Sequence, residues 1–171
     1  DKYQFDHPGE ETLCKNVDKF ITVTSLFNEN YERFKKPILH IPHAIPNEEF
    51  TPEIEKVQEH KELLPSNQQK LGIYIGTIDG RLDYDVLKQM HEEIEDANFV
   101  YIGPKRIDSI PAAQELFIDN PPPNLFYLPP VHFSRLKYFV ANADFGFAIM
   151  NENVNGTNIS HHKTLQYMAQ G

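Results

Sequence analysis

Two loops carry residues whose types and spacing suit the binding of an anion. The first, residues 76–83, follows an apolar run and contains Gly76, Gly80 and Arg81. Glycines let the backbone approach a ligand closely, and an arginine offers a planar fork of donors that matches a phosphate. This loop predicts a diphosphate site. The same residues also fit a plain strand-to-helix turn in which Arg81 pairs with Asp79 or Asp83.

The second loop, residues 151–163, is rich in side-chain donors and acceptors and leads into a helix predicted to begin at Ser160. Free N–H groups at a helix start attract anions. Lys163 stands in the first turn, where a positive charge opposes the helix dipole. Because a residue that breaks a local rule is a candidate for function, Lys163 is predicted to bind the anion. The alternative is a solvated surface loop with a badly placed lysine.

Neither loop carries the motif of a cofactor or a metal. The pattern G-x-G-x-x-G and the Walker lysine pattern are absent, which counts against a nicotinamide cofactor. His161 and His162 are adjacent and have no further His or Cys at ligand spacing. We therefore expect no cofactor and no metal. His132 could line a base pocket or close a turn, and the turn is the simpler interpretation.

Short apolar runs that alternate with amphipathic stretches must position both loops. Strands are predicted at residues 20–24, 38–41, 71–76, 98–103, 124–128 and 144–150. Helices are predicted from Pro8, from Ser25, over 54–64, over 84–95, from Ser134 and from Ser160. The inner faces of two helices are predicted to carry Leu87, Met90 and Ile94, and Leu165, Met168 and Ala169. Apolar strands separated by helices predict an α/β fold, a Rossmann-like parallel sheet with helices on both faces. Ligands of such sheets bind beyond the carboxyl ends of the strands.

Composition narrows the class of protein. The 171 residues include 16 Lys and Arg against 25 Asp and Glu, a formal charge of −9. Nucleic-acid affinity depends on neutralising phosphates, so no nucleic-acid partner is expected. The single cysteine excludes an internal disulfide and fits a reducing compartment, and no apolar run reaches the roughly 20 residues that span a bilayer. The chain begins without Met and stops inside a predicted helix, which indicates a fragment of a longer protein.

Several short segments, in order along residues 18–171, are similar to the motifs of one family. They are residues 18–25, 41–50, 74–83, 99–104, 124–125, 143–144 and the ending K-T-L-Q-Y-M-A-Q-G at 163–171. The last segment is similar to K-L-Y-E-Y-M-A-x-G. Each motif is loose alone, but together they resemble the group 1, family 4-like, glycosyltransferases of the two-domain GT-B fold, and mainly their C-terminal donor-binding domain.

This resemblance implies a domain division and a set of site residues. Residues 1–45 would be the end of the N-terminal, acceptor-side domain with the crossover, and residues 46–171 a C-terminal nucleotide-sugar donor domain, incomplete at its end. The resemblance implies binding of the donor diphosphate and sugar by Gly76, Thr77, Arg81, Thr157, Ser160, His162 and Lys163. It places Gln166 at the position of the carboxylate that holds the nucleotide ribose, and the catalytic residues stay unassigned.

The activity implied is transfer of a sugar from a nucleoside-diphosphate sugar to a glycan or lipid-linked acceptor, in polysaccharide biosynthesis. The implied location is the cytoplasm, with peripheral association at the inner face of the membrane through the rest of the protein. Asn158 and Gln166 depart from the family, since many relatives have glutamates at these two positions. A catalytically degenerate binding or scaffold domain therefore stays open as the alternative. A third interpretation is another α/β nucleotide-binding enzyme, such as an epimerase or a dehydrogenase.

Overall fold

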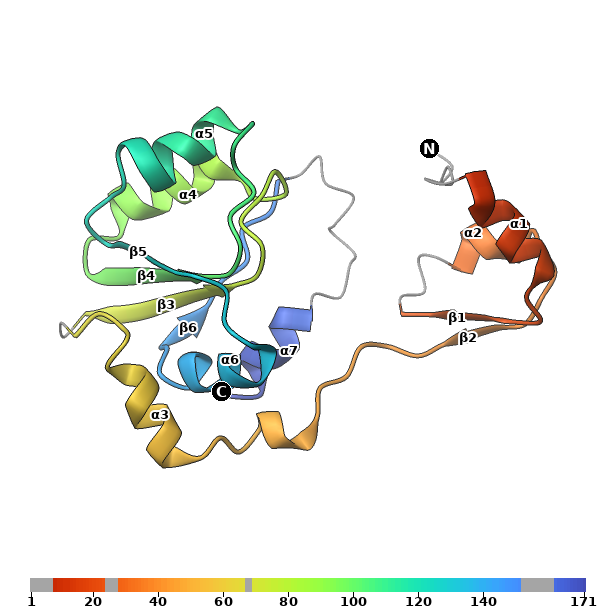
Figure 1. The fold of residues 1–171 in the computed structure, drawn as a ribbon, viewed down its shortest axis with the longest axis horizontal. Helices are drawn as coiled ribbons and strands as arrows, with labels where there is room; N and C mark the ends of the chain where they lie inside the picture. The colour runs from red at the N-terminus through yellow and green to blue at the C-terminus, as the bar shows by residue number, and fades with distance from the viewer. Residues whose placement is uncertain (1–7, 24–27, 67–68, 152–161) are drawn as a thin grey trace. The chain divides into compact units, whose positions relative to one another are not determined.

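The computed structural model describes residues 8–23, 28–66, 69–151 and 162–171. Among them, residues 8–23 and 28–44, together with His162, belong to one compact unit. Residues 45–66, 69–151 and 163–171 belong to a second. Figure 1 traces both units along the chain.

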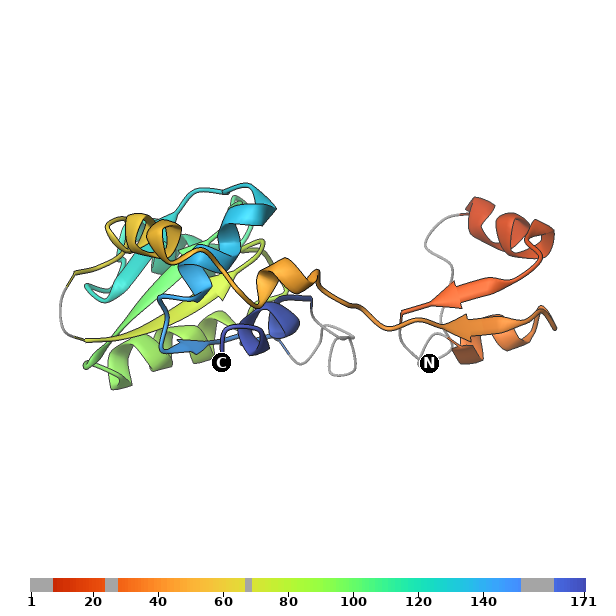
Figure 2. The same cartoon turned by 90° about the horizontal axis from the view of Figure 1, so that it is seen from below.

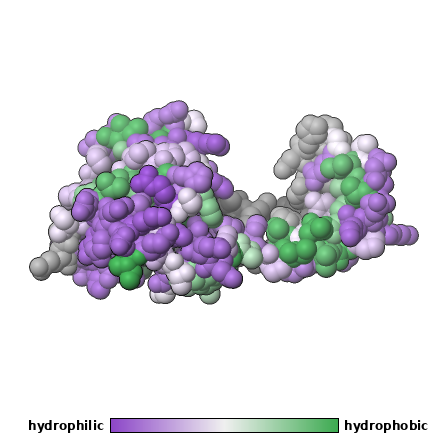
Figure 3. All heavy atoms as spheres, turned by 60° about the horizontal axis from the view of Figure 1, so that its bottom comes forward, coloured by the Kyte–Doolittle hydropathy of each residue, from purple (hydrophilic) through white to green (hydrophobic). Residues whose placement is uncertain are grey.

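The first unit pairs two short parallel strands with two helices. Its elements are α1 (Pro8–Asn16), β1 (Phe20–Thr22), α2 (Asn28–Glu32) and β2 (Ile38–His40). The Phe20 ring stacks on Tyr31 with the ring centroids 4.8 Å apart, which fixes α2 against β1. Ile21 and Leu39 are register partners and are 60% and 51% exposed, so apolar side chains gather on the surface of this unit (Figure 3). Both predicted strands are confirmed, with β1 ending at Thr22.

The second unit is built on a parallel four-stranded sheet in the order β5-β4-β3-β6. Its strands are β3 (Lys70–Ile75), β4 (Ala97–Ile102), β5 (Leu125–Leu128) and β6 (Phe145–Gly146). Its helices are η2 (Asn47–Glu49), α3 (Ile54–Lys61), α4 (Tyr84–Glu93), α5 (Pro111–Gln114), η3 (Glu115–Asp119), α6 (Phe133–Val140) and α7 (His162–Met168). The predicted α/β fold with a Rossmann-like parallel sheet is confirmed.

Helices cover both faces of this sheet because its strands are apolar on both sides (Figures 1 and 2). Tyr74, Phe99 and Tyr101 point to the face that packs against α4, α5 and η3. Their neighbours along the strands, Ile73 and Val100, point to the opposite face, where α6 packs. The two resulting cores hold β3 and β4 rigidly in the centre of the unit, and the loops that follow these strands inherit that rigidity.

The end of the sheet differs from the prediction. The strand predicted at 144–150 is reduced to Phe145–Gly146 because the chain then turns toward the loop that follows β3. Met150 forms an antiparallel bridge with Leu82, and the amide of Asn151 donates to the carbonyl of Arg81 at 2.8 Å. This turn contributes to the site, since it fixes the backbone of Arg81 from a second side.

Two helix predictions were wrong in detail. Ile94 was predicted inside, but α4 ends at Glu93 and Ile94 leaves helical geometry at φ −106° and ψ 85°, where it is 39% exposed. Met168 was also predicted inside and is 71% exposed. The buried face of α7 carries Gln166, and Met168 follows it by about 200° around the helix axis.

Three elements were missed or shifted. Helix α5 and the π-helical turn η3 were not predicted, although Pro111 and the apolar spacing of Ala113, Leu116 and Phe117 are typical of a helix. Helix α6 begins at Phe133 rather than Ser134. Its N-cap is His132, whose ring accepts from the Ser134 amide, so His132 closes the turn.

Candidate functional site

Two glycines end the central strands and bring their backbones into contact. Gly76 follows β3 with φ +139°, and Gly103 follows β4 with φ +147°. A Cβ atom on Gly103 would lie 2.1 Å from the carbonyl oxygen of Gly76. Only glycine allows both this conformation and this approach. The two loops therefore leave the carboxyl edge of the sheet side by side.

Tyrosine hydroxyls hold the backbone of the first loop. Tyr74, on β3, donates to the carbonyl of Thr77 at 2.8 Å, and Tyr84, on α4, donates to the carbonyl of Asp79 at 2.7 Å. The amide of Ile78 donates to the carbonyl of Pro104 in the neighbouring loop at 2.9 Å. Thr77 is thus part of a loop whose backbone is fixed at the carboxyl edge of the sheet.

Arg81 projects from this loop and forms an ion pair with Asp79. Its Nε lies 2.9 Å from Oδ1 of Asp79, and its Nη2 lies 2.8 Å from Oδ2. This is the pairing that the turn interpretation of the sequence predicted. Burial raises the pKa of the Asp79 carboxyl, but the hydrogen bonds from Arg81 and the charges of Arg81 and Arg106 outweigh burial and lower it overall. Asp79 in turn raises the pKa of Arg81, so both groups are charged.

Lys163 reaches the same edge of the sheet from α7. Its Nζ lies 3.9 Å from the ring centroid of Tyr74, a cation–π contact, and 3.1 Å from where a Cβ on Gly76 would stand. Burial of the ammonium and repulsion by Arg81 lower the pKa of Lys163 to about 8, with Asp79 opposing them. The structure therefore places the Lys163 ammonium beside Gly76 and within electrostatic range of Arg81.

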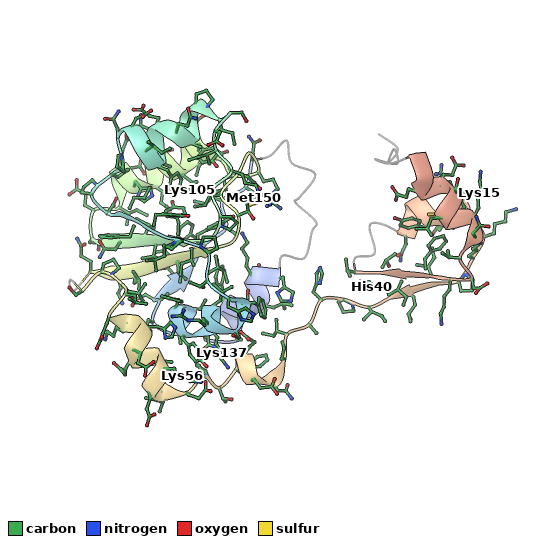
Figure 4. The ribbon with its side chains drawn as sticks, in the orientation of Figure 1. Lys15, His40, Lys56, Lys105, Lys137 and Met150 are labelled. Carbon is green, nitrogen blue, oxygen red and sulfur yellow. The ribbon has the colours of Figure 1, made fainter. Side chains whose placement is uncertain are left out.

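Two further cations, Lys105 and Arg106, lie in the loop that follows β4 and were not predicted as site residues. A parallel bridge joins Lys105 to Ile78, and the amide of Arg106 donates to the Ile78 carbonyl at 2.9 Å. Lys105 lies over the ring of Tyr127 at 4.2 Å, and Figure 4 labels it near Met150 at this edge of the sheet. Two adjacent basic residues just after a strand that ends in glycine were the available signal.

The structure says less about the other predicted site residues, which are Thr157, Ser160, His162 and Gln166. Thr157 and Ser160 lie outside the described residues. His162 is the first residue of α7. Gln166 lies on α7 and is 4% exposed, and its Nε2 has no hydrogen-bond partner among the residues that the structure describes. Its role at the ribose stays a prediction.

A groove on this unit, away from Arg81 and Lys163, has the wrong charge for a diphosphate. It is a groove of about 880 Å³ between α4 and the α5–η3 segment. Its walls include Asp85, Glu92, Glu95 and Glu115 against a single lysine, Lys88. Carboxylates repel an anion, so this groove does not suit a diphosphate.

The described part of the chain adds two observations about other kinds of site. In residues 8–23, 28–66, 69–151 and 162–171, no group of three or more His, Cys, Asp and Glu side chains could hold a metal ion. Within the same ranges, no helix has the length and apolar character needed to cross a membrane.

The α/β fold of the chain matches about half of a GT-B glycosyltransferase. HepE from Anabaena, solved in complex with UDP-glucose, matches with a TM-score of 0.68 and 6% identity, over 93% of this chain and 44% of that one. HepE in complex with UDP and glucose matches with a TM-score of 0.59 and 7% identity, over 76% and 37%. Sucrose-phosphate synthase from Thermosynechococcus elongatus matches with a TM-score of 0.58 and 19% identity, over 85% and 40%.

These matches extend over most of the chain, which spans less than half the length of the proteins that it matches. At such identities the likeness shows the fold. No protein-family model matches the sequence, and a search of curated proteins finds no match.

Proposed function

We propose that this protein binds a nucleoside-diphosphate sugar at the cationic edge of its second unit, which is the carboxyl edge of the sheet that carries Arg81 and Lys163. It would transfer the sugar to a glycan or lipid-linked acceptor. The observation that carries the proposal is the position of the Lys163 ammonium, which lies over Tyr74 beside Gly76 and within electrostatic range of Arg81. The complex of HepE with UDP-glucose, on the same fold, supports this class of ligand. The proposal takes residues 46–171 as the donor-binding domain and residues 1–45 as the end of the acceptor-side domain, in a cytoplasmic protein.

The site suits the departure of a diphosphate. When the bond between the sugar and the phosphate oxygen breaks, negative charge builds up on the diphosphate. Positive groups already fixed in place stabilise this charge without reorganising, and they act more strongly where water is excluded. Lys163 is such a group because it is partly desolvated over the ring of Tyr74. Gly76 and Thr77 supply backbone close to the phosphates, and Thr157, Ser160, His162 and Gln166 are proposed to complete the donor site.

Calorimetry tests the binding step. The whole protein is titrated with UDP-glucose, UDP and GDP. We expect saturable binding of at least one of them, and weaker binding when Arg81 is replaced by Ala. Absence of binding at millimolar nucleotide would overturn the proposal.

The affinity is expected to depend on pH through Lys163. Its pKa of about 8 in the free protein rises when an anion binds, so binding takes up a proton once the pH exceeds that value. Affinity for UDP-glucose should be level below pH 8 and fall by up to about tenfold per pH unit above it. The measurement is a series of titrations between about pH 6.5 and about pH 9.

The matched control for the pH series is Lys163→Arg, because a guanidinium stays charged over the whole range. For this variant, the slope of affinity against pH reports only the titration that does not come from Lys163, such as that of the uracil ring of UDP-glucose. Equal slopes for the two proteins would contradict the assignment of the titration to Lys163.

A catalytically degenerate binding or scaffold domain is the second candidate. Two observations favour it: Gln166 is buried and carries no charge, and Arg81 is already paired with Asp79. This candidate predicts that Gln166→Glu and Arg81→Ala leave nucleotide binding and function unchanged. The enzyme predicts that Arg81→Ala weakens donor binding, so one titration separates the two.

A further inference from the structure

One carboxylate stands among the cations of the proposed donor site. Asp79 contacts Arg81 through both oxygens, at 2.9 and 2.8 Å. It also interacts electrostatically with Arg106 and with Lys163. Lys105 lies over the ring of Tyr127 instead. A negative group in the middle of an anion site weakens the site, so its presence calls for a physical reason.

The geometry leaves part of the guanidinium available. Asp79 uses the edge of Arg81 formed by Nε and Nη2. A guanidinium has five N–H donors, so Nη1 and the second hydrogen of Nη2 can still bind a phosphate in the forked arrangement. Asp79 and a phosphate can therefore contact Arg81 at the same time.

Asp79 cannot easily move out of the way. The Arg81 amide donates to its Oδ1 at 3.1 Å, and the Tyr84 hydroxyl holds its carbonyl at 2.7 Å. Its side chain is 20% exposed, against 55% for Arg81. A ligand bound here consequently meets the negative charge of Asp79 as well as the positive charges around it.

The net charge of Asp79 and three nearby cations matches that of one form of the ligand. Arg81, Arg106 and Lys163 with Asp79 leave two net positive charges. A nucleoside-diphosphate sugar carries two negative charges, because each phosphate is linked on both sides. A free nucleoside diphosphate gains most of a third charge at neutral pH, since its terminal phosphate loses a second proton near pH 6, as in other phosphate monoesters (pKa ≈ 6).

We propose that Asp79 sets the charge preference of the site, favouring the sugar-linked diphosphate over the free nucleoside diphosphate by repelling the third charge. This inference rests on the proposed function and goes beyond it by assigning a specificity-determining residue. Arg81 and Lys163 stabilise the charge that develops on the leaving group, and Asp79 limits how tightly the finished product is held. Release of that product is a step that often limits turnover.

The test compares two ligands on three proteins. Affinities for UDP-glucose and UDP are measured by calorimetry at about pH 7.5, well above the phosphate pKa, at constant salt, on the wild type, on Asp79→Asn and on the control Glu92→Gln. Glu92 is an exposed residue on α4, and its replacement by Gln removes one negative charge, as Asp79→Asn does. Asn keeps the acceptor for the Arg81 amide, so the turn is retained. If uridine is not the base, GDP-mannose and GDP replace the pair.

Asp79→Asn is expected to raise the affinity for UDP relative to UDP-glucose by about three- to tenfold, the effect of one unit charge at a separation of several ångströms in a partly aqueous site. Glu92→Gln should leave the ratio unchanged. If the ratio of the two affinities is unchanged in Asp79→Asn, even with an equal loss for both ligands, the inference is overturned. Asp79 would then serve only to orient Arg81. A wild type that binds none of the four ligands would instead overturn the proposed function.

Discussion

Replacing Lys163 with methionine is expected to weaken UDP-glucose binding by about 10- to 100-fold, while the free energy of unfolding stays level or rises. A charged hydrogen bond to an anion contributes about 1.5–3 kcal/mol, which corresponds to this loss of affinity. The stability is expected to move the other way because the folded protein holds the ammonium partly buried and near Arg81. Methionine fills a similar volume and packs on Tyr74 without that cost.

The opposite signs of the two effects make this experiment informative. If Lys163 stabilised the fold, its replacement would lower the free energy of unfolding and leave ligand affinity unchanged. If Lys163 binds the ligand, its replacement lowers the affinity and leaves the free energy of unfolding level or higher. Titration calorimetry measures the binding, and urea unfolding measures the stability. The matched control is Lys88→Met on the exposed side of α4, for which neither quantity should change by much. Unchanged affinity in Lys163→Met would remove Lys163 from the site.

The fold was predictable because its central strands are apolar on both faces. Runs such as Leu71–Ile75 have few alternatives to a sheet covered by helices on both sides, whatever their exact ends. Short elements were harder to predict. Residues 147–150 are as apolar as the strands, but only the Phe147 amide still bonds β3, at the Ile73 carbonyl, before the chain turns and Met150 pairs with Leu82. That pairing depends on a loop far away in the sequence, which local patterns do not describe.

The sequence could predict a site residue only where that residue type is unfavourable in its local structure. Lys163 stood out because a cation in the first turn of a helix is unfavourable. Tyr74 did not stand out, because a tyrosine inside an apolar strand is typical of core packing, yet its ring supports the Lys163 ammonium. Asp79 and Arg81 are only two residues apart, and sequence alone left open whether they pair. Spacing brings such groups within reach, but only the turn geometry decides the contact.

Replacing Gly103 with alanine is expected to destabilise the second unit by about 3 kcal/mol or more. The residue has φ +147°, a conformation that costs an L-residue about 1–3 kcal/mol, and the new Cβ would lie 2.1 Å from the carbonyl oxygen of Gly76. Relief requires the two loops to separate. Their separation would strain the hydrogen bond from the Gly76 amide to the Ile102 carbonyl at 2.9 Å. Urea unfolding followed by circular dichroism measures the loss.

Gly80→Ala is the matched control, because it adds the same methyl group to the same pair of loops. The nearest atom to a Cβ on Gly80 is 3.6 Å away, which is ordinary contact. This variant should stay within about 0.5 kcal/mol of the wild type. A similarly small effect for Gly103→Ala would show that the loops can separate easily. Arg81 and Lys163 would then lack a rigid base, and their stabilisation of a leaving diphosphate would lose the preorganisation on which it depends.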